Sequence, residues 1–306
     1  MTTKKKRTTK HVVGNIFNLI KKWQLDAYDG FSYPLVNGIV FSNEGENGRK
    51  PLFDASKNKT GDIMAYWKYK EDGILEVTCP NRGYEVKAPK IMSEYFRGTV
   101  FYGNGAKDKT ISYLDVTHLD VSQSTDFSGC FKNFGQYGGV TVRGLNNWNV
   151  KQGINFARMF AESFWGNQVV ELDLSTWNFS RMESINMNSM FRNFASNAES
   201  VMLNLKGWYL TSVTDFSQMF DNFAQEAETV NISGIEDWSV GQSGSFSYMF
   251  LHFASKSKCQ LDLSNWSKEH KLSDWHNDFA KGTFFRIKEP EWMTRKERME
   301  ATKNGV

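Results

Sequence analysis

The side chains best placed to do chemistry in this sequence are carboxylates and amides at alternate positions of short apolar runs. The run from Val170 to Leu174 alternates apolar and polar residues, and this period of two predicts a strand with one buried face. The polar positions of this run and its counterparts hold Glu171, Asp173, Asn204, Asn231 and Asp262. Such a ladder of oxygens could bind a cation or the hydroxyl groups of a glycan. The alternative is a solvated polar face without a ligand.

Other residues that often carry chemistry are scattered. His270 and His276 have a spacing that fits no metal-site pattern, and Cys79, Cys130 and Cys259 lie far apart without paired spacing. The sequence contains no nucleophile elbow, P-loop, HExxH or EF-hand pattern. We therefore expect no catalytic residue, no cofactor site and no metal centre, and we expect that the protein is not an enzyme.

An aromatic-x-x-Met-Phe signature returns about every thirty residues and organises the middle of the chain. A tryptophan follows each copy by 16 to 18 residues. A fixed period of this size predicts an array in which each unit stacks on its neighbours. Two columns of side chains should therefore be buried and stacked, the tryptophans as a core ladder rather than a sugar-binding surface: Phe131, Phe160, Phe191, Phe220 and Phe250, and Trp148, Trp177, Trp208, Trp238 and Trp266.

Within each copy, the apolar spacing predicts a helix. Phe156, Met159, Phe160 and Phe164 follow the i, i+3, i+4, i+8 pattern of one helix face. Asp or Asn precedes four of the copies, where its side chain could cap free backbone N–H groups (Asp126, Asn155, Asn186 and Asp215). The predicted fold class is therefore an α/β repeat, a leucine-rich-repeat-like solenoid with one short parallel strand and one helix per thirty residues.

The repeats resemble a known family. The run from Leu172 to Ser180, followed by Asn186 to Phe191, is similar to the BspA-like, DUF285-type repeat of bacterial surface proteins, whose pattern is close to dLS-nWdvSnVtnMsgMF. Leu261 to Trp266 resembles the first half of this pattern and Ser212 to Phe220 the second half. The similarity covers about residues 111 to 283, although the period here is longer than the family's typical unit. The resemblance implies display outside a cell, for adhesion or recognition.

The regions outside the repeats differ in composition. Residues 32–41, 66–70 and 74–78 are predicted strands of a small β-rich N-terminal module. Residues 91–96 and 113–121 have the pattern of a degenerate opening repeat, and Glu291 to Glu300 that of a charged closing helix. We expect a basic arm and anchoring helix at 1–25, the β-rich module at 26–90, the repeats at 91–283 and a capping helix at 284–306.

The N-terminal segment is the predicted attachment point. Lys4, Lys5, Lys6, Arg7 and Lys10 precede an apolar stretch, and the tract lacks the apolar core and cleavage site of a secretory signal. Such a segment could be a peripheral membrane segment or an anchor on a larger particle. The alternative is a solvated tail followed by a docking helix. The anchoring side chains would be Ile16, Phe17, Ile20 and Trp23.

These observations suggest a non-enzymatic structural or display protein. The leading hypothesis is a bacteriophage virion component (capsid decoration, fibre or tail protein) that presents the repeat surface and contacts other virion or surface proteins through its N-terminal segment. The alternatives are a bacterial cell-surface adhesin and an intracellular scaffold that binds proteins. A protein or glycan receptor could occupy the repeat surface. The net charge of +3 and the absence of an 18-residue apolar window argue against a specific nucleic-acid partner and membrane contact.

Overall fold

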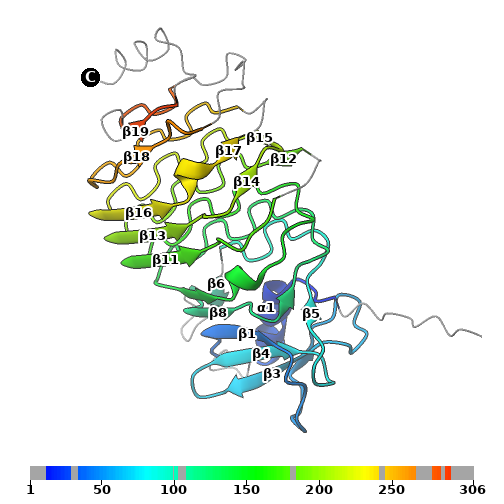
Figure 1. Cartoon of the computed structure of the whole chain (residues 1–306). Coiled ribbons are helices and arrows are strands. Elements are labelled where there is room, and N and C mark those ends of the chain that lie inside the picture. Colours follow the sequence, from blue (N-terminus) through cyan, green and yellow to red (C-terminus); the bar gives the residue numbers. More distant parts are fainter. Residues whose placement is uncertain are drawn as a thin grey trace, which may run out of the picture.

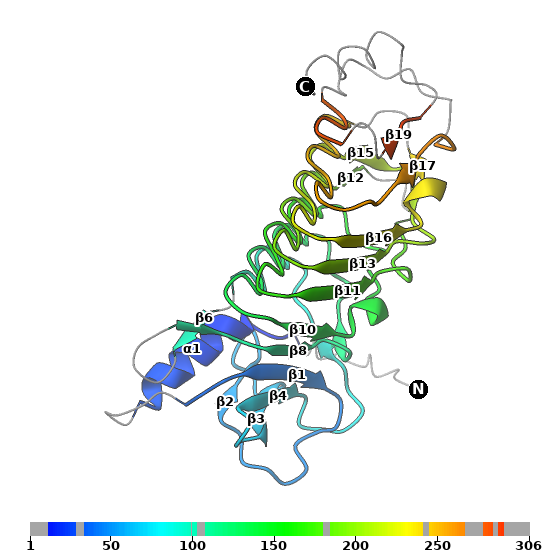
Figure 2. The same ribbon diagram turned by 90° about the vertical axis from the view of Figure 1, so that its left-hand side faces the viewer.

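The computed structural model describes residues 12–28, 34–98, 100–102, 108–179, 184–240, 245–266, 278–283 and 287–290. The molecule is elongated: a broad N-terminal part carries the helix, and coils of chain stack on it one after another toward the C-terminus (Figures 1 and 2). The predicted closing helix at Glu291 to Glu300 lies outside the described residues, as does the basic tract before Val12.

The N-terminal part is a sheet with a helix packed on it. The helix α1 spans Ile16–Asp26, and the side chain of Asn15 caps it by accepting a hydrogen bond from the backbone N–H of Asn18 at 3.1 Å. The six-stranded sheet has the order β10-β8-β1-β4-β3-β2. Its strands are β1 (Gly38–Ser42), β2 (Phe53–Asp54), β3 (Met64–Tyr69), β4 (Ile74–Thr78), β8 (Tyr113–Asp115) and β10 (Thr141–Arg143).

This sheet connects the N-terminal part to the repeats. β3 is antiparallel to β2 and β4, as suits short connections, whereas β1 is parallel to both β4 and β8, and β8 is parallel to β10. The three strands predicted in this part of the chain are present as β1, β3 and β4. Because β8 and β10 belong to the opening coils, hydrogen bonding runs without a break across the expected boundary at residue 90.

The repeats contribute a parallel sheet of three strands. β11 (Val169–Asp173), β13 (Ser200–Asn204) and β16 (Thr229–Ser233) pair in register, so that Leu172, Leu203 and Ile232 lie side by side and are buried. The alternation that predicted these strands is confirmed: each strand buries its second and fourth residues, and its central residue is exposed.

Shorter strands and turns complete each coil. Four pairs are parallel and one, β6 with β7, is antiparallel. The pairs are β5 (Val86–Lys87) with β9 (Leu119–Asp120), β6 (Val100–Tyr102) with β7 (Asp108–Thr110), β12 (Ile185–Asn186) with β15 (Val213–Asp215), β14 (Tyr209–Leu210) with β17 (Ser239–Val240), and β18 (Leu261–Asp262) with β19 (Ile287–Lys288). Two 3₁₀ helices, Leu145–Asn147 and Ile235–Asp237, lie directly before Trp148 and Trp238.

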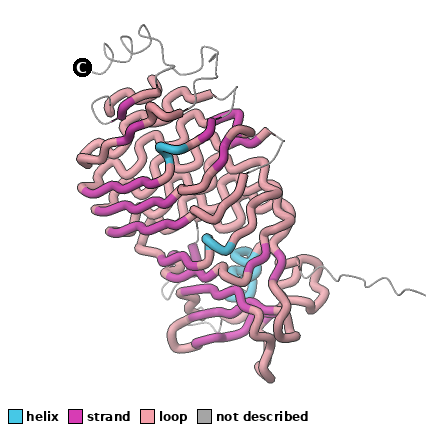
Figure 3. Tube along the Cα trace, in the orientation of Figure 1, coloured by secondary structure: helices cyan, strands magenta, loops and turns pink. Residues whose placement is uncertain are grey.

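The predicted helix in each repeat is wrong, and with it the α/β leucine-rich-repeat-like fold class. Among the described residues α1 is the single α-helix, and the signature segments are turns (Figure 3). The backbone N–H of Met159 donates to Phe156 O at 3.1 Å, but that of Phe160 donates to Met190 O of the next coil at 2.8 Å. Arg158 has a φ of 58°, the left-handed value that a type II turn needs at its third residue.

A turn ladder, in which the same turn is stacked in successive coils, and a helix give similar spacing of apolar residues. For this reason the sequence pattern predicted a helix. Each i to i+3 turn places Phe156 and Met159 on the same side of the chain, as a helix would. The residues predicted as helix N-caps instead form Asx turns, in which a side-chain oxygen accepts from the N–H two residues on. The distances are 2.9 Å from Ser128 N to Asp126, 3.2 Å from Ala157 N to Asn155, 2.9 Å from Asn188 N to Asn186 and 2.9 Å from Ser217 N to Asp215.

The two predicted aromatic columns form the central part of the repeat core, and their burial and stacking are confirmed. Successive rings from Phe131 to Phe250 are 5.2 to 5.5 Å apart and within 8° of parallel. Successive tryptophans from Trp148 to Trp266 are 5.8 to 6.3 Å apart and within 17° of parallel. Phe96 of the opening repeat stacks on Phe131 at 5.1 Å and extends the ladder. The result is a regular frame that holds the strands β11, β13 and β16 in place.

Candidate functional site

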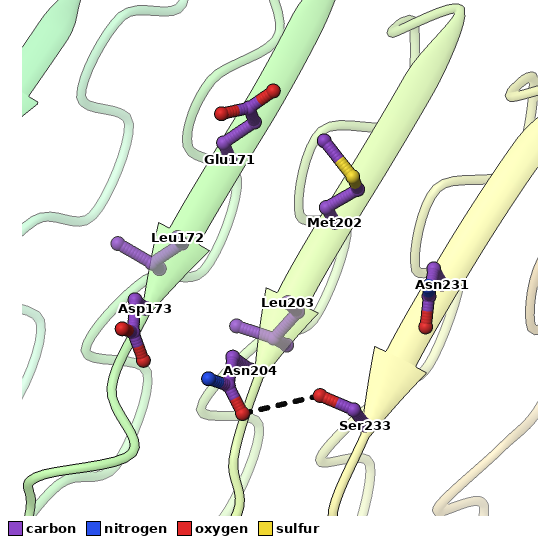
Figure 4. Close-up of a pocket in the computed structure, with 8 residues that line it drawn as sticks. All are labelled: Glu171, Leu172, Asp173, Met202, Leu203, Asn204, Asn231 and Ser233. Atoms are coloured by element: carbon purple, nitrogen blue, oxygen red, sulfur yellow. Dashed lines mark hydrogen bonds between the residues drawn. The ribbon is translucent and has the colours of Figure 1, made fainter.

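The outward side chains of β11, β13 and β16 line a shallow groove of about 460 Å³ that is open to solvent (Figure 4). Four of the five predicted ladder residues come together there, because the three strands pair in register. The lining residues are Glu171, Leu172, Asp173, Met202, Leu203, Asn204, Asn231 and Ser233. We call this surface the sheet face.

Part of the polar ladder is used by the fold itself. Asp173 accepts a hydrogen bond from the backbone N–H of Ser175 at 3.0 Å, in the same Asx geometry as the turns above. One oxygen of Asn204 accepts both Lys206 N–H at 3.2 Å and the Ser233 hydroxyl at 3.1 Å. The second carboxylate oxygen of Asp173 and the amide nitrogen of Asn204 are left without such a bond in the described part of the chain.

The centre of the groove holds side chains that have no structural task among the described residues. Glu171 and Asn231 are exposed, and neither side chain has a hydrogen bond or ion pair within that part of the structure. Between them lies Met202, which is 41% exposed although it is apolar. An exposed flexible apolar side chain flanked by free hydrogen-bonding groups has the composition of a contact surface.

The fifth predicted residue, Asp262, belongs to a different contact. It lies on β18 and forms an ion pair with Lys288 of β19 at 2.8 Å. This ion pair links β19, the last described strand, to β18. Hydrogen bonds from Lys288 and Ser264 hold the pKa of this exposed carboxylate down at about 2. Asp262 is therefore occupied by the chain itself and does not line the groove.

Besides the buried Leu172 and Leu203, two lining residues of the groove were missed from the sequence, Met202 and Ser233. Met202 stands at the outward position of the run from Val201 to Leu203, where an apolar residue breaks the alternation. That break was an available signal, since a strand with one solvated face should carry a polar residue there. Ser233 gave no signal of its own, because its role depends on the neighbouring Asn204 across the strand pair.

The predicted anchoring side chains pack into the chain's own core. Ile16 and Ile20 are fully buried. Phe17 contacts the ring of Phe96 at 5.5 Å, and Trp23 lies 5.7 Å from the ring of Trp67. A partner that bound these four side chains would have to displace α1 from the sheet, so α1 has the contacts of a docking helix.

A second depression, of about 700 Å³, lies beside the point where the described chain begins. Three lysines line it, and its one acidic side chain, Asp120, already accepts the N–H of Ser122 at 2.9 Å. We call it the basic depression, and its lining residues are Val12, Lys57, Asn58, Thr60, Lys87, Ala88, Lys90, Asp120 and Gln123.

The described residues contain neither a metal-binding cluster nor a membrane-spanning helix. Within them, no cluster of three or more His, Cys, Asp or Glu side chains has an arrangement that could hold a metal ion. None of the helices formed by those residues has the length and apolar character needed to cross a bilayer.

Comparison with known proteins identifies the family. No curated protein and no solved structure matches the chain. The family model described as Mycoplasma protein of unknown function, DUF285, matches residues 90–231 and 186–304, which together cover the repeats and more than half of the chain. The match confirms the resemblance that the repeat motifs indicated, and the chain belongs to the DUF285 family.

Proposed function

We propose that this chain is a non-enzymatic structural protein whose sheet face docks a macromolecular partner. The observation that carries the proposal is the groove across β11, β13 and β16, where free polar groups surround the exposed Met202. Sites for small molecules are enclosed pockets that bury most of the ligand, whereas this groove is shallow and open. An open face of this kind suits a large partner that supplies its own complementary surface.

The aromatic core supports this proposal because it makes the face rigid. The strand spacing is fixed by stacked rings on the inner side, such as the pair Trp177 and Trp208 at 6.3 Å. A rigid face loses little conformational entropy when a partner binds, so that a larger share of the contact energy appears as affinity.

Photocrosslinking tests the docking role directly. Met202 is replaced by the photoreactive residue benzoylphenylalanine, and the variant is irradiated in the cells or particles that contain the protein. The matched control carries the same residue at Tyr209, which is 54% exposed in the same repeat but lies on β14. We expect a discrete adduct from position 202 and none of the same mass from position 209. If position 202 gives no adduct, or if both positions give the same one, the proposal fails.

The location proposed from the sequence is a bacteriophage particle, in which the chain would be a capsid-decorating, fibre or tail component. Mass spectrometry of purified particles tests this, and we expect the chain at a fixed ratio to the major capsid protein. Recovery in the bacterial envelope fraction, with none in particles, would replace the virion by the adhesin alternative. Recovery in the cytosol alone would favour the intracellular scaffold.

A further inference from the structure

The sheet face carries negative charge in a chain whose net charge is positive. Its lining residues include two carboxylates, Glu171 and Asp173, and no lysine or arginine. Two further carboxylates, Glu199 and Glu228, stand one residue before β13 and β16, whereas the whole chain has a net charge of +3. All four are exposed and form no ion pair among the described residues: Glu171, Asp173, Glu199 and Glu228.

Positive charge is concentrated in the N-terminal segment of the chain. Residues 1–11 contain five lysine or arginine side chains and no carboxylate. The described chain begins at Val12, which lines the basic depression together with Lys57, Lys87 and Lys90. The first described residue of the chain therefore lies at the basic depression.

We propose that the sheet face binds the basic arm, residues 1–11, of a second copy of this chain. This inference rests on the docking role proposed above and names the occupant of the face. The charges are complementary, and the carboxylate of Glu171 and the second carboxylate oxygen of Asp173 supply acceptors for lysine and arginine side chains.

The positions of the two surfaces favour a second copy over the chain's own arm. The backbone of Val12 bridges to Lys87 of β5, and β5 lies on a different side of the molecule from β11, β13 and β16 (Figure 1). Contacts between different surfaces of identical copies repeat from one copy to the next and build a ring or an open row. Such an assembly fits a structural protein.

The dimensions of the arm fit the face. Eleven extended residues span at most about 36 Å. Three strands of a sheet are about 10 Å across, and five residues of strand are about 16 Å long. The arm can therefore cross the whole face, placing its cations near both Glu171 on β11 and Glu228 before β16. An electrostatic contact between exposed groups should weaken strongly with salt.

Zero-length crosslinking of the intact protein tests the proposal. Equal amounts of ¹⁵N-labelled and unlabelled full-length chains are mixed, and a carbodiimide joins carboxylates to lysines in direct contact. We expect peptides that join a labelled Lys4, Lys5, Lys6 or Lys10 to an unlabelled Glu171 or Asp173. Sedimentation velocity should show association that weakens by about tenfold or more between 50 and 500 mM salt.

Charge variants supply the control. In the E171Q/D173N variant the asparagine keeps the oxygen that accepts Ser175 N–H, so the turn is preserved. The E71Q/D72N variant also removes two negative charges, but from exposed positions between β3 and β4. We expect E171Q/D173N to lose the crosslinks and the association, and E71Q/D72N to retain both.

Three results would overturn the inference: crosslinks confined to a single copy, a monomer at both salt concentrations, or equal loss in the two variants. The photocrosslinking result then separates the two proposals. An adduct from position 202 with a different macromolecule, in a chain that stays monomeric, would remove the second copy as occupant but keep the docking role. No adduct of any kind at position 202 would remove both.

Discussion

The indole rings of Trp177 and Trp208 lie 6.3 Å apart and within 3° of parallel, one above the other in successive coils. The Nε1–H of Trp208 also donates to the backbone oxygen of Leu174 at 2.8 Å, so each tryptophan joins two coils by both stacking and hydrogen bonding. Trp177 and Trp266 make the same bond to Leu145 and Ile235 of the preceding coil. Trp238 stacks equally well, but its Nε1–H has no partner among the described residues.

This difference predicts unequal effects of one substitution. Trp208→Phe removes ring volume and one of the two hydrogen bonds that the oxygen of Leu174 accepts, the other coming from the backbone N–H of Trp177 at 3.0 Å. Trp238→Phe removes similar volume together with an unsatisfied donor. We expect Trp208→Phe to lower the free energy of unfolding by about 1 kcal/mol more than Trp238→Phe, the net contribution of one hydrogen bond. Denaturant unfolding followed by circular dichroism measures this difference. Equal losses would mean that the hydrogen bond adds nothing to the stacking.

The corrected turn structure makes a prediction that a helix would reverse. Asn193 has a φ of 53°, and its side chain makes no hydrogen bond among the described residues. In this left-handed conformation Asn193→Val should be less stable than Asn193→Gly by about 1 to 2 kcal/mol. In a helix interior valine would be the more stable of the two, since glycine is the poorest helix former after proline. Thermal unfolding of the two variants therefore decides between turn and helix.

The regular features of the fold could be predicted from the sequence, and the turn geometry could not. Period-two alternation at Val170, Leu172 and Leu174 identified a strand because few other structures bury every second residue. The aromatic signature identified the stacked columns, but the spacing of Phe156 and Met159 fits both a helix and a turn ladder. The deciding signal was Asn at positions 133, 193 and 222, since Asn readily adopts positive φ.

The candidate site was partly predictable for the same reason. Register follows from the repeat, so that Glu171, Asp173, Asn204 and Asn231 could be placed on one face from their positions in the strands. Some of their side-chain oxygens accept hydrogen bonds from the turn that follows each strand. The alternation of apolar and polar residues does not describe that turn, so these hydrogen bonds could not be predicted. Asp262 is exposed on β18, as the alternation predicts, but its ion pair with Lys288 could not be predicted because the two residues are distant in sequence.

Two glycines in the corners before Trp208 and Trp238 can be compared. Gly207 and Gly234 both have positive φ, 79° and 93°, but their surroundings differ. A Cβ on Gly207 would lie 3.5 Å from Ser175 O, an ordinary contact, whereas on Gly234 it would lie 2.4 Å from the backbone of Lys206. We expect Gly234→Ala to be less stable than Gly207→Ala by about 2 kcal/mol, because the backbone must move. Similar midpoints of unfolding for the two variants would show that the coils can separate without cost.

The last prediction concerns a carboxylate buried in the N-terminal sheet. Glu76 on β4 has a fully buried side chain, with Arg49 Nη2 at 2.5 Å and Lys68 Nζ at 3.3 Å. Burial alone would raise the pKa of Glu76, but interactions with Ser42 and Arg49 and the charge of Lys68 outweigh it, and the pKa lies below its ordinary value of 4.5. A group whose pKa is lower in the folded state stabilises the fold above its unfolded pKa. This stability is lost as the pH falls through the folded value.

We therefore expect the free energy of unfolding to fall below pH 4.5, and the fall to be smaller in Glu76→Gln. At pH 7 this variant should be less stable than the natural chain by about 2 kcal/mol, because Arg49 and Lys68 lose their buried partner. The loss is limited because both cations are partly exposed to water and Lys68 keeps Glu44 at 3.6 Å. Glu71→Gln, at an exposed position near the same sheet, is the control and should keep the natural profile. Denaturant unfolding at pH 3.5, 5 and 7 measures all three proteins. A Glu76→Gln profile parallel to that of the natural chain would show that this carboxylate does not set the acid sensitivity of the sheet.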